Sequence, residues 1–399
     1  MKMKKIWIAV VAVVIVAVVG LGSWWAVDRN TYAGMVASSK DVKKWTADTK
    51  PLQSNAAVEK QLNRLTQATK ADKDLMATQA TIVIPGLRGA WSINHKTGKA
   101  EFGTDWVPQG VTQSGFDFYI SMYDGKHKLN SIITQVSQDT GKYVKTLILN
   151  STSHVGAITY DTTHKRLIWS DDNGKPDGAG FGYANQNTID TYQASVAQAP
   201  IESNRIKWAL GHRTSAMTLY NNQLIIVKYG AKKSQHSIVA VSLNKQGLPN
   251  PVSSKEMKAA IAKAPTADLE KDPLNTGLKQ LIKDKIIDSY TAGWNRMQGV
   301  AIAKNGVTLI SQSNGEHPGK IFIRVPEGGG WSNLKFKKPT IGATEVNVPN
   351  SVEQVSLTTD GQLLSMAFES GARQYRESGS FLHRNQFMDR LLVLGVKVE

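Results

Sequence analysis

The sequence predicts an all-β fold, a β-propeller, and three observations predict it. A short pattern recurs five times: a small residue opens a strand of alternating apolar residues, and a turn leads into a second apolar strand. The copies begin at Gly110, Gly156, Ala216, Gly299 and Gln354, so by subtraction their starts lie 46, 60, 83 and 55 positions apart. The hairpins that follow these starts have similar sizes. Repeats of about 40–50 residues with several strands per unit are typical of propeller blades.

Composition restricts the class of protein further. Hydrophobic residues make up 41% of the 399 residues, which is too many for a mostly disordered chain. The formal net charge is +16 and the pI is near 9.7. Polyanions are therefore the partners that electrostatics favours, namely nucleic acid, anionic lipid or anionic wall polymers. The chain has no cysteine, so its stability cannot depend on disulfides.

The N-terminus predicts export. Lysines precede Ile6–Val27, an uncharged and almost wholly apolar stretch of 22 residues. About 20 such residues cross a bilayer as a helix, whereas a cleaved signal needs an apolar region of only about 7–15. We therefore predict a signal-anchor at 1–27 that holds the chain in the membrane with its N-terminus in the cytoplasm. A signal peptide removed after export is the alternative.

An exported chain has little access to nucleic acid, so we expect no nucleic-acid partner despite the charge. A bacterial cell membrane, of the Gram-positive type whose wall is rich in anionic polymers, suits a basic and cysteine-free exported protein. Residues 28–78 are polar and tolerant of helix, which predicts a helical stalk. The partners expected on this basis are the membrane, an anionic wall polymer and an envelope protein.

Strand character extends from 79 to the C-terminus, at 399, with one interruption. Ser253 and Glu256 form a capping-box pattern, and Asp272 followed by Pro273 is a typical helix start. Apolar residues then recur at helical spacing. These signals predict a helical insertion at about 251–292, which either borders the binding face or serves only as a stabilising cap.

The two ends of the propeller region predict how the ring closes. Arg390–Val398 is strand-like, and Thr81–Pro85 is its natural partner, because pairing the ends of the chain in one blade removes an exposed edge. Five copies plus this closing unit predict six blades, with five or seven as alternatives.

Polar residues recur where each repeat begins and where its second strand ends. The two strands of a hairpin place both positions at the same end of the sheet, so the repeats should bring these residues to one rim around the central channel. The predicted ligand-binding rim comprises Gln109, Asp124, His154, Asp171, Asp172, Arg213, Gln298, Asn314, Glu353 and Glu369, with Lys228 and Tyr229 in the equivalent positions of the third copy. The alternative is a purely structural role, in which each side chain caps its own turn.

The rim residues suggest two kinds of chemistry. His154 has the side chain of a general base near neutral pH, although a histidine at a strand start more often has a structural role. Asp171, Asp172 and Glu353 offer the carboxylate oxygens that Ca²⁺ or Mg²⁺ prefers, without any contiguous calcium-loop motif. No other cofactor is indicated.

Several phrases resemble a group of exported bacterial β-propeller proteins that is broadly similar to the streptogramin-lyase and NHL-like propellers. The phrases are WVPQGVTQSGFDFYISMYD, SHVGAITYDTTHKRLIWSDD, NRMQGVAI, VPNSVEQVSL and MAFESGARQY. The resemblance covers about residues 80–399 and implies the propeller fold. In streptogramin lyases a histidine and acidic residues near a divalent cation support ring opening by elimination. Only His154, Glu353, Asp171 and Asp172 match those roles by position here.

Two functions follow as hypotheses. The first, which we favour, is a membrane-anchored extracellular propeller that binds a ligand or partner at the cell envelope through its polar rim. The second is a divalent-metal-dependent lyase or hydrolase, of the streptogramin-lyase or lactonase type, with His154 as its base.

Overall fold

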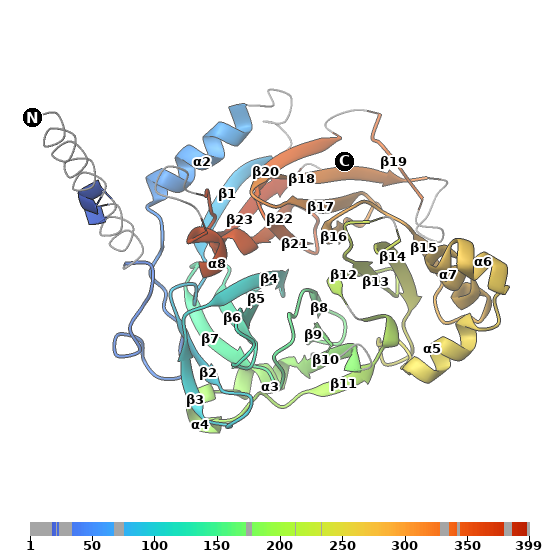
Figure 1. The fold of residues 1–399 in the computed structure, drawn as a ribbon, viewed down its shortest axis with the longest axis horizontal. Coiled ribbons are helices and arrows are strands. Elements are labelled where there is room, and N and C mark those ends of the chain that lie inside the picture. The colour runs from blue at the N-terminus through green and yellow to red at the C-terminus, as the bar shows by residue number, and fades with distance from the viewer. Residues whose placement is uncertain are drawn as a thin grey trace, which may run out of the picture.

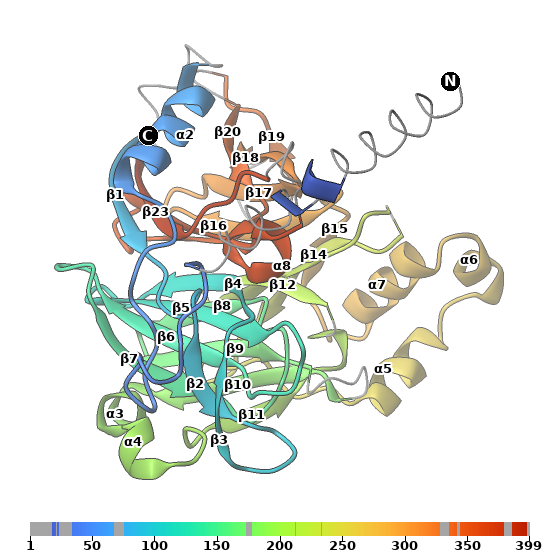
Figure 2. The ribbon, with the colours of Figure 1, turned by 60° about the vertical axis from the view of Figure 1, so that its left-hand side comes forward.

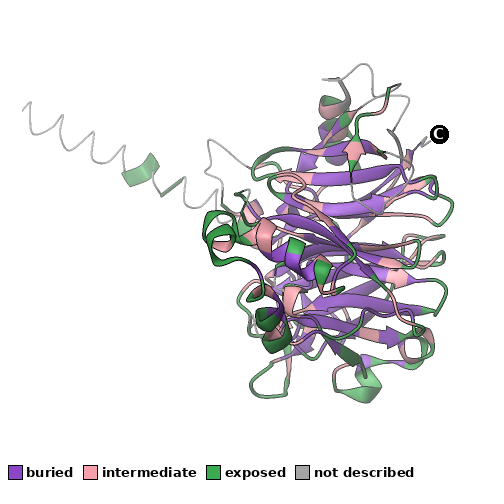
Figure 3. Cartoon of the chain, turned by 90° about the vertical axis from the view of Figure 1, so that its right-hand side faces the viewer, coloured by how far each residue is buried: buried purple, intermediate pink, exposed green. Residues whose placement is uncertain are grey.

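The structure is a computed structural model that describes residues 18–20, 22–23, 34–67, 76–172, 178–211, 213–232, 234–327, 335–340, 344–378 and 385–396. Five antiparallel sheets surround a central channel, with strands β4, β8, β12, β16 and β21 innermost (Figure 1). Each innermost strand contacts the next one around the ring, and β21 contacts β4. The chain therefore forms a β-propeller of five blades. The strands are mostly buried and the connecting loops are mostly exposed (Figure 3).

The strands of each blade follow one another outward from the channel, except that β19 and β20 both pair with β18 in the fourth blade and that β1, from the N-terminal part of the chain, is outermost in the fifth. The first three blades are β4 (Trp106–Gln113), β5 (Asp117–Asp124), β6 (Ile132–Ser137), β7 (Tyr143–Ile148); β8 (Ile158–Asp161), β9 (Arg166–Asp171), β10 (Gly180–Asn185), β11 (Asn204–Lys207); and β12 (Thr214–Tyr220), β13 (Gln223–Lys228), β14 (Ser237–Ser242), β15 (Ser289–Thr291). The last two are β16 (Met297–Ile302), β17 (Thr308–Asn314), β18 (His317–Pro326), β19 (Phe336–Lys337), β20 (Glu345–Asn350); and β21 (Val352–Leu357), β22 (Leu363–Phe368), β23 (Arg390–Val396), β1 (Met76–Val83).

The remaining elements lie outside the blades. A separate hairpin consists of β2 (Ala90–Ile93) and β3 (Ala100–Gly103). The helices are α2 (Asn55–Gln67), α3 (Gln186–Thr191), α4 (Ala194–Ala197), η3 (Ala209–Gly211), α5 (Ser254–Ile261), α6 (Thr266–Lys271), α7 (Pro273–Lys283), η5 (Glu369–Gly371) and α8 (Arg373–Arg376).

The predicted ring closure is confirmed, whereas the favoured count of six blades is wrong. Strand β1 pairs with β23, and Thr81 lies opposite Leu392. Strand β23 also pairs with β22, which belongs to the hairpin of the fifth sequence copy. The closing unit and the fifth copy are therefore one blade. The prediction of six blades treated the closing unit and the fifth copy as two blades, because the sequence does not show which sheet the last strand joins.

The segment predicted as a stalk packs against the propeller over its described residues, 34–67. Trp45 and Ala47 are buried in a core cluster shared by the first, second and fifth blades, and Ala47 forms a β-bridge with Ala90. Val58 of α2 is buried against β20, and Figure 2 shows α2 lying along that blade. These contacts arise because the segment carries apolar side chains that a solvated spacer would leave in water.

The predicted anchor at Ile6–Val27 lies outside the described residues except for 18–20 and 22–23, which are helical. Within the described parts of the chain, no helix is both long enough and apolar enough to span a bilayer.

The predicted helical insertion contains α5, α6 and α7, between β14 and β15. Ser253 and Glu256 form the predicted capping box, in which each side chain bonds the backbone N–H of the other residue. The insertion leaves the third blade after Ser242, which pairs with Gln223 at the opposite end from Lys228. It lies at the outer edge of the ring (Figure 1). It therefore does not border the rim on which the candidate ligand-binding residues were predicted.

Candidate functional site at the upper mouth of the channel

We call the end of the channel where the innermost strands begin the upper mouth, and the end where they finish the lower mouth. Four of the five innermost strands carry a register shift near the upper mouth. The shifts fall at Pro108/Val111, Thr214/Ala216, Met297/Gly299 and Val352/Val355. A bulge of this kind leaves a residue out of the ladder and re-aims its side chain, and bulges are frequent beside active sites. The residues skipped by the ladders include the predicted rim residues Gln109, Gln298 and Glu353.

Small residues stand at this level because the innermost strands approach each other closely. A Cβ atom on Gly156 would lie 2.7 Å from the carbonyl oxygen of Thr214 in the next blade. Serine hydroxyls join neighbouring blades at the same level. Ser121 Oγ accepts from Gly110 N at 2.9 Å and donates to Val155 O at 2.8 Å, while Ser311 Oγ donates to Glu353 O at 2.7 Å.

Gln354 crosses the channel below this level. Its side-chain amide bonds both backbone groups of Ile158 in β8 and donates to Met217 O of β12 at 3.2 Å. One cavity lies at the upper mouth and another at the lower mouth. Along β8 and β12, Ile158 and Met217 lie between the residues that line the first cavity and those that line the second. The buried Gln354 side chain therefore lies between two separate cavities.

The cavity at the upper mouth, the upper basin, has a volume of about 510 Å³. Five predicted rim residues line it, together with Tyr229 of the equivalent position in the third blade: Gln109, His154, Asp172, Arg213 and Gln298. Sequence reasoning missed Val155, Gly156, Ser170, Thr214 and Ser215, which also line it. These residues are small or follow the rim residues directly, and no pattern of charge marks them.

The other predicted rim residues do not line the upper basin. Asp124 Oδ2 accepts from the backbone N–H groups of Lys128 and Leu129. Asp124 therefore caps its own turn, which is the structural role given above as the alternative to ligand binding. Asp171 accepts from Ser153 Oγ at 2.5 Å and pairs with Arg205. Asn314 lies in the β17–β18 turn opposite His317 and is exposed.

Glu353, which is buried, and Glu369, which is half-buried, lie behind two of the lining residues. Gln298 Nε2 donates to Glu353 Oε1 at 3.1 Å, and Gln109 Nε2 donates to Glu369 Oε1 at 3.3 Å. Burial raises the pKa of Glu353 well above its ordinary value, the charge of Glu369 raises it further, and the bond from Gln298 opposes this. Burial also raises the pKa of Glu369, against hydrogen bonds from Tyr375 and Gln109. Both carboxyls thus favour the neutral form and hold two amide side chains in place.

This pair should make stability fall as the pH rises. Below the ordinary pKa of 4.5 a glutamate is protonated in both folded and unfolded chains. Between 4.5 and the raised folded pKa, the folded chain binds more protons, so the unfolding free energy falls by up to about 1.4 kcal/mol per pH unit for each such group. Glu353→Gln removes one of these groups while keeping an amide oxygen for Gln298. We expect its Tm to rise relative to the parent as the pH increases from 4.5.

Thermal unfolding across the pH range checks this expectation. Glu59→Gln, on the exposed side of α2, is the matched control and should follow the parent at every pH. A Glu353→Gln curve parallel to that of the parent would show that Glu353 is ionised in the folded chain.

The third blade brings two cationic side chains together. Arg213 lines the upper basin and is exposed, with a left-handed φ of 61°. Lys228 ends β13 beside it, half-buried, and both burial and the neighbouring Arg213 lower its pKa. Among the described residues, neither side chain has an acidic partner within ion-pair distance. A cation pair held without a counter-ion is costly, and an anion would relieve the cost.

The ring of His154 lies 4.2 Å, between centroids, from that of Tyr123 and 5.1 Å from that of His127. The stack holds His154 at the wall of the upper basin. Its role as a general base stays a prediction.

The metal ligands predicted from the sequence are not gathered into one site. Asp172 lines the upper basin, Asp171 is paired with Arg205, and Glu353 is buried in the fifth blade behind Gln298. In the part of the chain that the structure describes, no group of three or more His, Cys, Asp or Glu side chains is arranged to hold a metal ion.

The chain was compared with known protein families, sequences and structures. No protein-family model matches the chain, and neither does any curated protein sequence. Among solved structures, it is similar to the PQQ-bound aldose sugar dehydrogenase from Streptomyces coelicolor (12% identity, TM-score 0.43, covering 81% of this chain and 98% of that one). It is also similar to a chain of the mitotic checkpoint complex (10%, 0.31, 77% and 82%). A third similar structure is a putative 6-phosphogluconolactonase from Bacteroides uniformis (9%, 0.30, 64% and 61%). Such distant similarity says nothing of activity, so the sheet topology carries the assignment of a β-propeller.

Proposed function

We propose that this propeller is an exported, membrane-anchored protein of the bacterial cell envelope that binds a ligand through a carboxylate or phosphate group in its upper basin. The observation that carries the proposal is the pair Arg213 and Lys228, which has no counter-ion among the described residues. A guanidinium binds a carboxylate or phosphate through two parallel hydrogen bonds, and a neighbouring ammonium adds a further donor.

The remaining wall supports a ligand that also carries hydroxyl groups. Gln109 and Gln298 each use their amide nitrogen to bond a glutamate, which leaves their amide oxygens as acceptors for a ligand. Tyr229 and Ser215 add hydroxyl groups to the same wall. An anionic group at the third blade and ligand hydroxyls toward the first and fourth blades would match this arrangement.

The envelope location rests on the sequence of Ile6–Val27 and on the net charge of +16. Anionic wall polymers combine negative groups with hydroxyls, so they are the partners that both the charge and the upper basin favour. Protease added to spheroplasts should digest residues beyond 34 from outside, and protection of those residues would contradict the proposed topology.

Removal of either cation should weaken binding of an anion. Calorimetry with glycerol phosphate and with glucuronate, using the full chain, should show Arg213→Gln reducing affinity by about 10- to 100-fold, because hydrogen bonds to charged groups contribute about 1.5–3 kcal/mol. Arg64→Gln, on the exposed side of α2, is the matched control and should bind like the parent.

Lys228→Met separates binding from folding. It removes a half-buried cation, so we expect a higher Tm together with a weaker affinity for the same two anions. Equal affinities of the parent, Arg213→Gln and Lys228→Met would contradict the proposed function.

A further inference from the structure

A second cavity lies at the lower mouth of the channel, on the other side of Gln354. This lower basin has a volume of about 620 Å³, and all five blades contribute to its wall. It shares no lining residue with the upper basin. A ligand here would be independent of the anion proposed above.

Hydroxyl groups dominate the part of the wall nearest the channel axis. Four of the five innermost strands supply one each, from Thr112, Thr159, Thr218 and Ser356. Thr112 Oγ1 accepts from Tyr160 N at 3.1 Å, which leaves its hydroxyl hydrogen available. Within the described chain, the hydroxyls of Thr159 and Thr218 have no hydrogen-bond partner, and neither oxygen is sealed from solvent. Each of them is therefore able to donate to and accept from a ligand.

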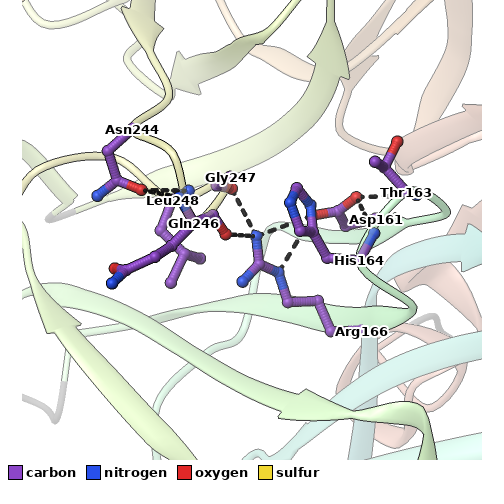
Figure 4. Close-up of polar contacts among 8 residues, drawn as sticks. All are labelled: Asp161, Thr163, His164, Arg166, Asn244, Gln246, Gly247 and Leu248. Carbon is purple, nitrogen blue, oxygen red and sulfur yellow. Dashed lines mark hydrogen bonds and ion pairs between the residues drawn. The ribbon is translucent and has the colours of Figure 1, made fainter.

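The charged groups on this wall are largely neutralised. Asp161 Oδ2 accepts from Arg166 Nε at 3.1 Å, from Arg166 Nη2 at 2.9 Å and from His164 Nδ1 at 2.8 Å (Figure 4). Its Oδ1 accepts from the backbone N–H groups of Thr163 and His164. Arg166 also donates to the carbonyl oxygens of Gln246 and Gly247, both at 2.7 Å, which fastens the second blade to a loop of the third. Lys304 adds a positive charge elsewhere on the wall.

Two tyrosine rings complete the lower basin. Tyr160 is held by the bond from its Oη to Gln186 Oε1 at 2.8 Å and by stacking on Tyr119 with ring centroids 6.0 Å apart. Tyr220, at the end of β12 in the neighbouring blade, also lines the cavity. The wall thus has free hydroxyls, aromatic faces and an acidic group whose oxygens already accept hydrogen bonds. Such a wall suits a ligand that has many hydroxyls and apolar C–H faces but no net charge.

We propose that the lower basin is a binding site for a neutral carbohydrate. Thr159 and Thr218 would exchange hydrogen bonds with its hydroxyls, and Tyr160 or Tyr220 would cover a face of a sugar ring. The two mouths of the propeller would then take ligands of different chemistry, an anion above and a neutral saccharide below.

Saturation-transfer NMR on the full chain, with glucose, N-acetylglucosamine, maltose and cellobiose as probes, tests the proposal. The chain is kept in a detergent without a sugar headgroup, because maltosides would compete for the site. We expect saturation transfer to at least one of these sugars. The double variant Thr159→Val/Thr218→Val, which removes two hydroxyls and preserves side-chain shape, should weaken binding about tenfold or more.

Two control variants keep the outcome unambiguous. Thr140→Val, in an exposed turn of the first blade, should bind like the parent. Arg213→Gln should leave sugar binding unchanged, because it alters only the upper basin. Absence of transfer to all four sugars would overturn the proposal. So would full binding by the double valine variant, or loss of sugar binding in Arg213→Gln.

Discussion

Gly299→Ala is expected to destabilise the propeller by about 3 kcal/mol or more, because the new Cβ atom has no room between the fourth and fifth blades. That atom would lie 2.4 Å from Ser311 Oγ, 2.7 Å from Val355 N and 2.9 Å from Glu353 O. Two of these three atoms belong to the backbone of β21, so moving one side chain cannot relieve the contact. The substitution also disturbs the hydrogen bond between Ser311 and Glu353 O, which joins the two blades.

A second glycine in the same chain offers a matched control. Gly277 lies inside α7, where a Cβ atom would meet nothing closer than 3.8 Å. Gly277→Ala should stabilise the chain by up to about 1 kcal/mol, because alanine favours the helix. Equilibrium unfolding of both variants against the parent measures the difference. Equal stability of Gly299→Ala and the parent would mean that the innermost strands are farther apart than the structure places them.

The sequence predicted the ring because its signals are local. An apolar strand, a turn and a second apolar strand lie within about twenty residues, and register follows from turn length. The number of blades is a question of pairing between distant segments. Arg390–Val396 has the same strand signal whether it joins the sheet of the fifth copy or starts another, so only the pairing with β22 distinguishes five blades from six.

The rim was partly predictable for a related reason. Polar residues at the start of each repeat drew attention to Gln109, Arg213 and Gln298, which do line the upper basin. The sequence could not show that a bulge interrupts the alternation of side chains at this level. Glu353 therefore looked like an exposed ligand, although it is buried behind Gln298 with a raised pKa.

No sequence pattern indicated the free hydroxyls of the lower basin. Threonine is a common strand residue, so the sequence around Thr159 and Thr218 indicates only that they lie in strands. Their significance depends on the neighbours that surround them in the ring. Likewise, the composition of 28–78 resembled a stalk because few of its residues are apolar, yet Trp45 and Val58 are buried against the propeller.

The packing of that segment leads to a second expected result, which concerns Asp389 and Arg390 at the start of β23. Their side chains form an ion pair and are each only 1% exposed. Asp389 Oδ2 accepts from Leu52 N at 2.6 Å and from Gln53 N at 2.9 Å. Arg390 Nη2 donates to Gln53 O at 2.8 Å. The pair thus fixes the segment before α2 to the strand that closes the ring.

Asp389→Asn should cost about 3–5 kcal/mol of stability, because it leaves the buried guanidinium without its counter-charge. The segment before α2 should also become sensitive to protease, since the charged oxygen that accepts from both Leu52 N and Gln53 N is replaced by a neutral amide. The matched control is Glu345→Gln, which breaks the exposed pair with Lys320 and should cost at most about 1 kcal/mol. Chemical unfolding and limited proteolysis measure the two effects separately. If the loss of stability occurs without new cleavage around residue 52, the pair stabilises the ring but does not hold the N-terminal segment. If neither changes, the guanidinium finds water in the folded chain, and the closing blade does not depend on this ion pair.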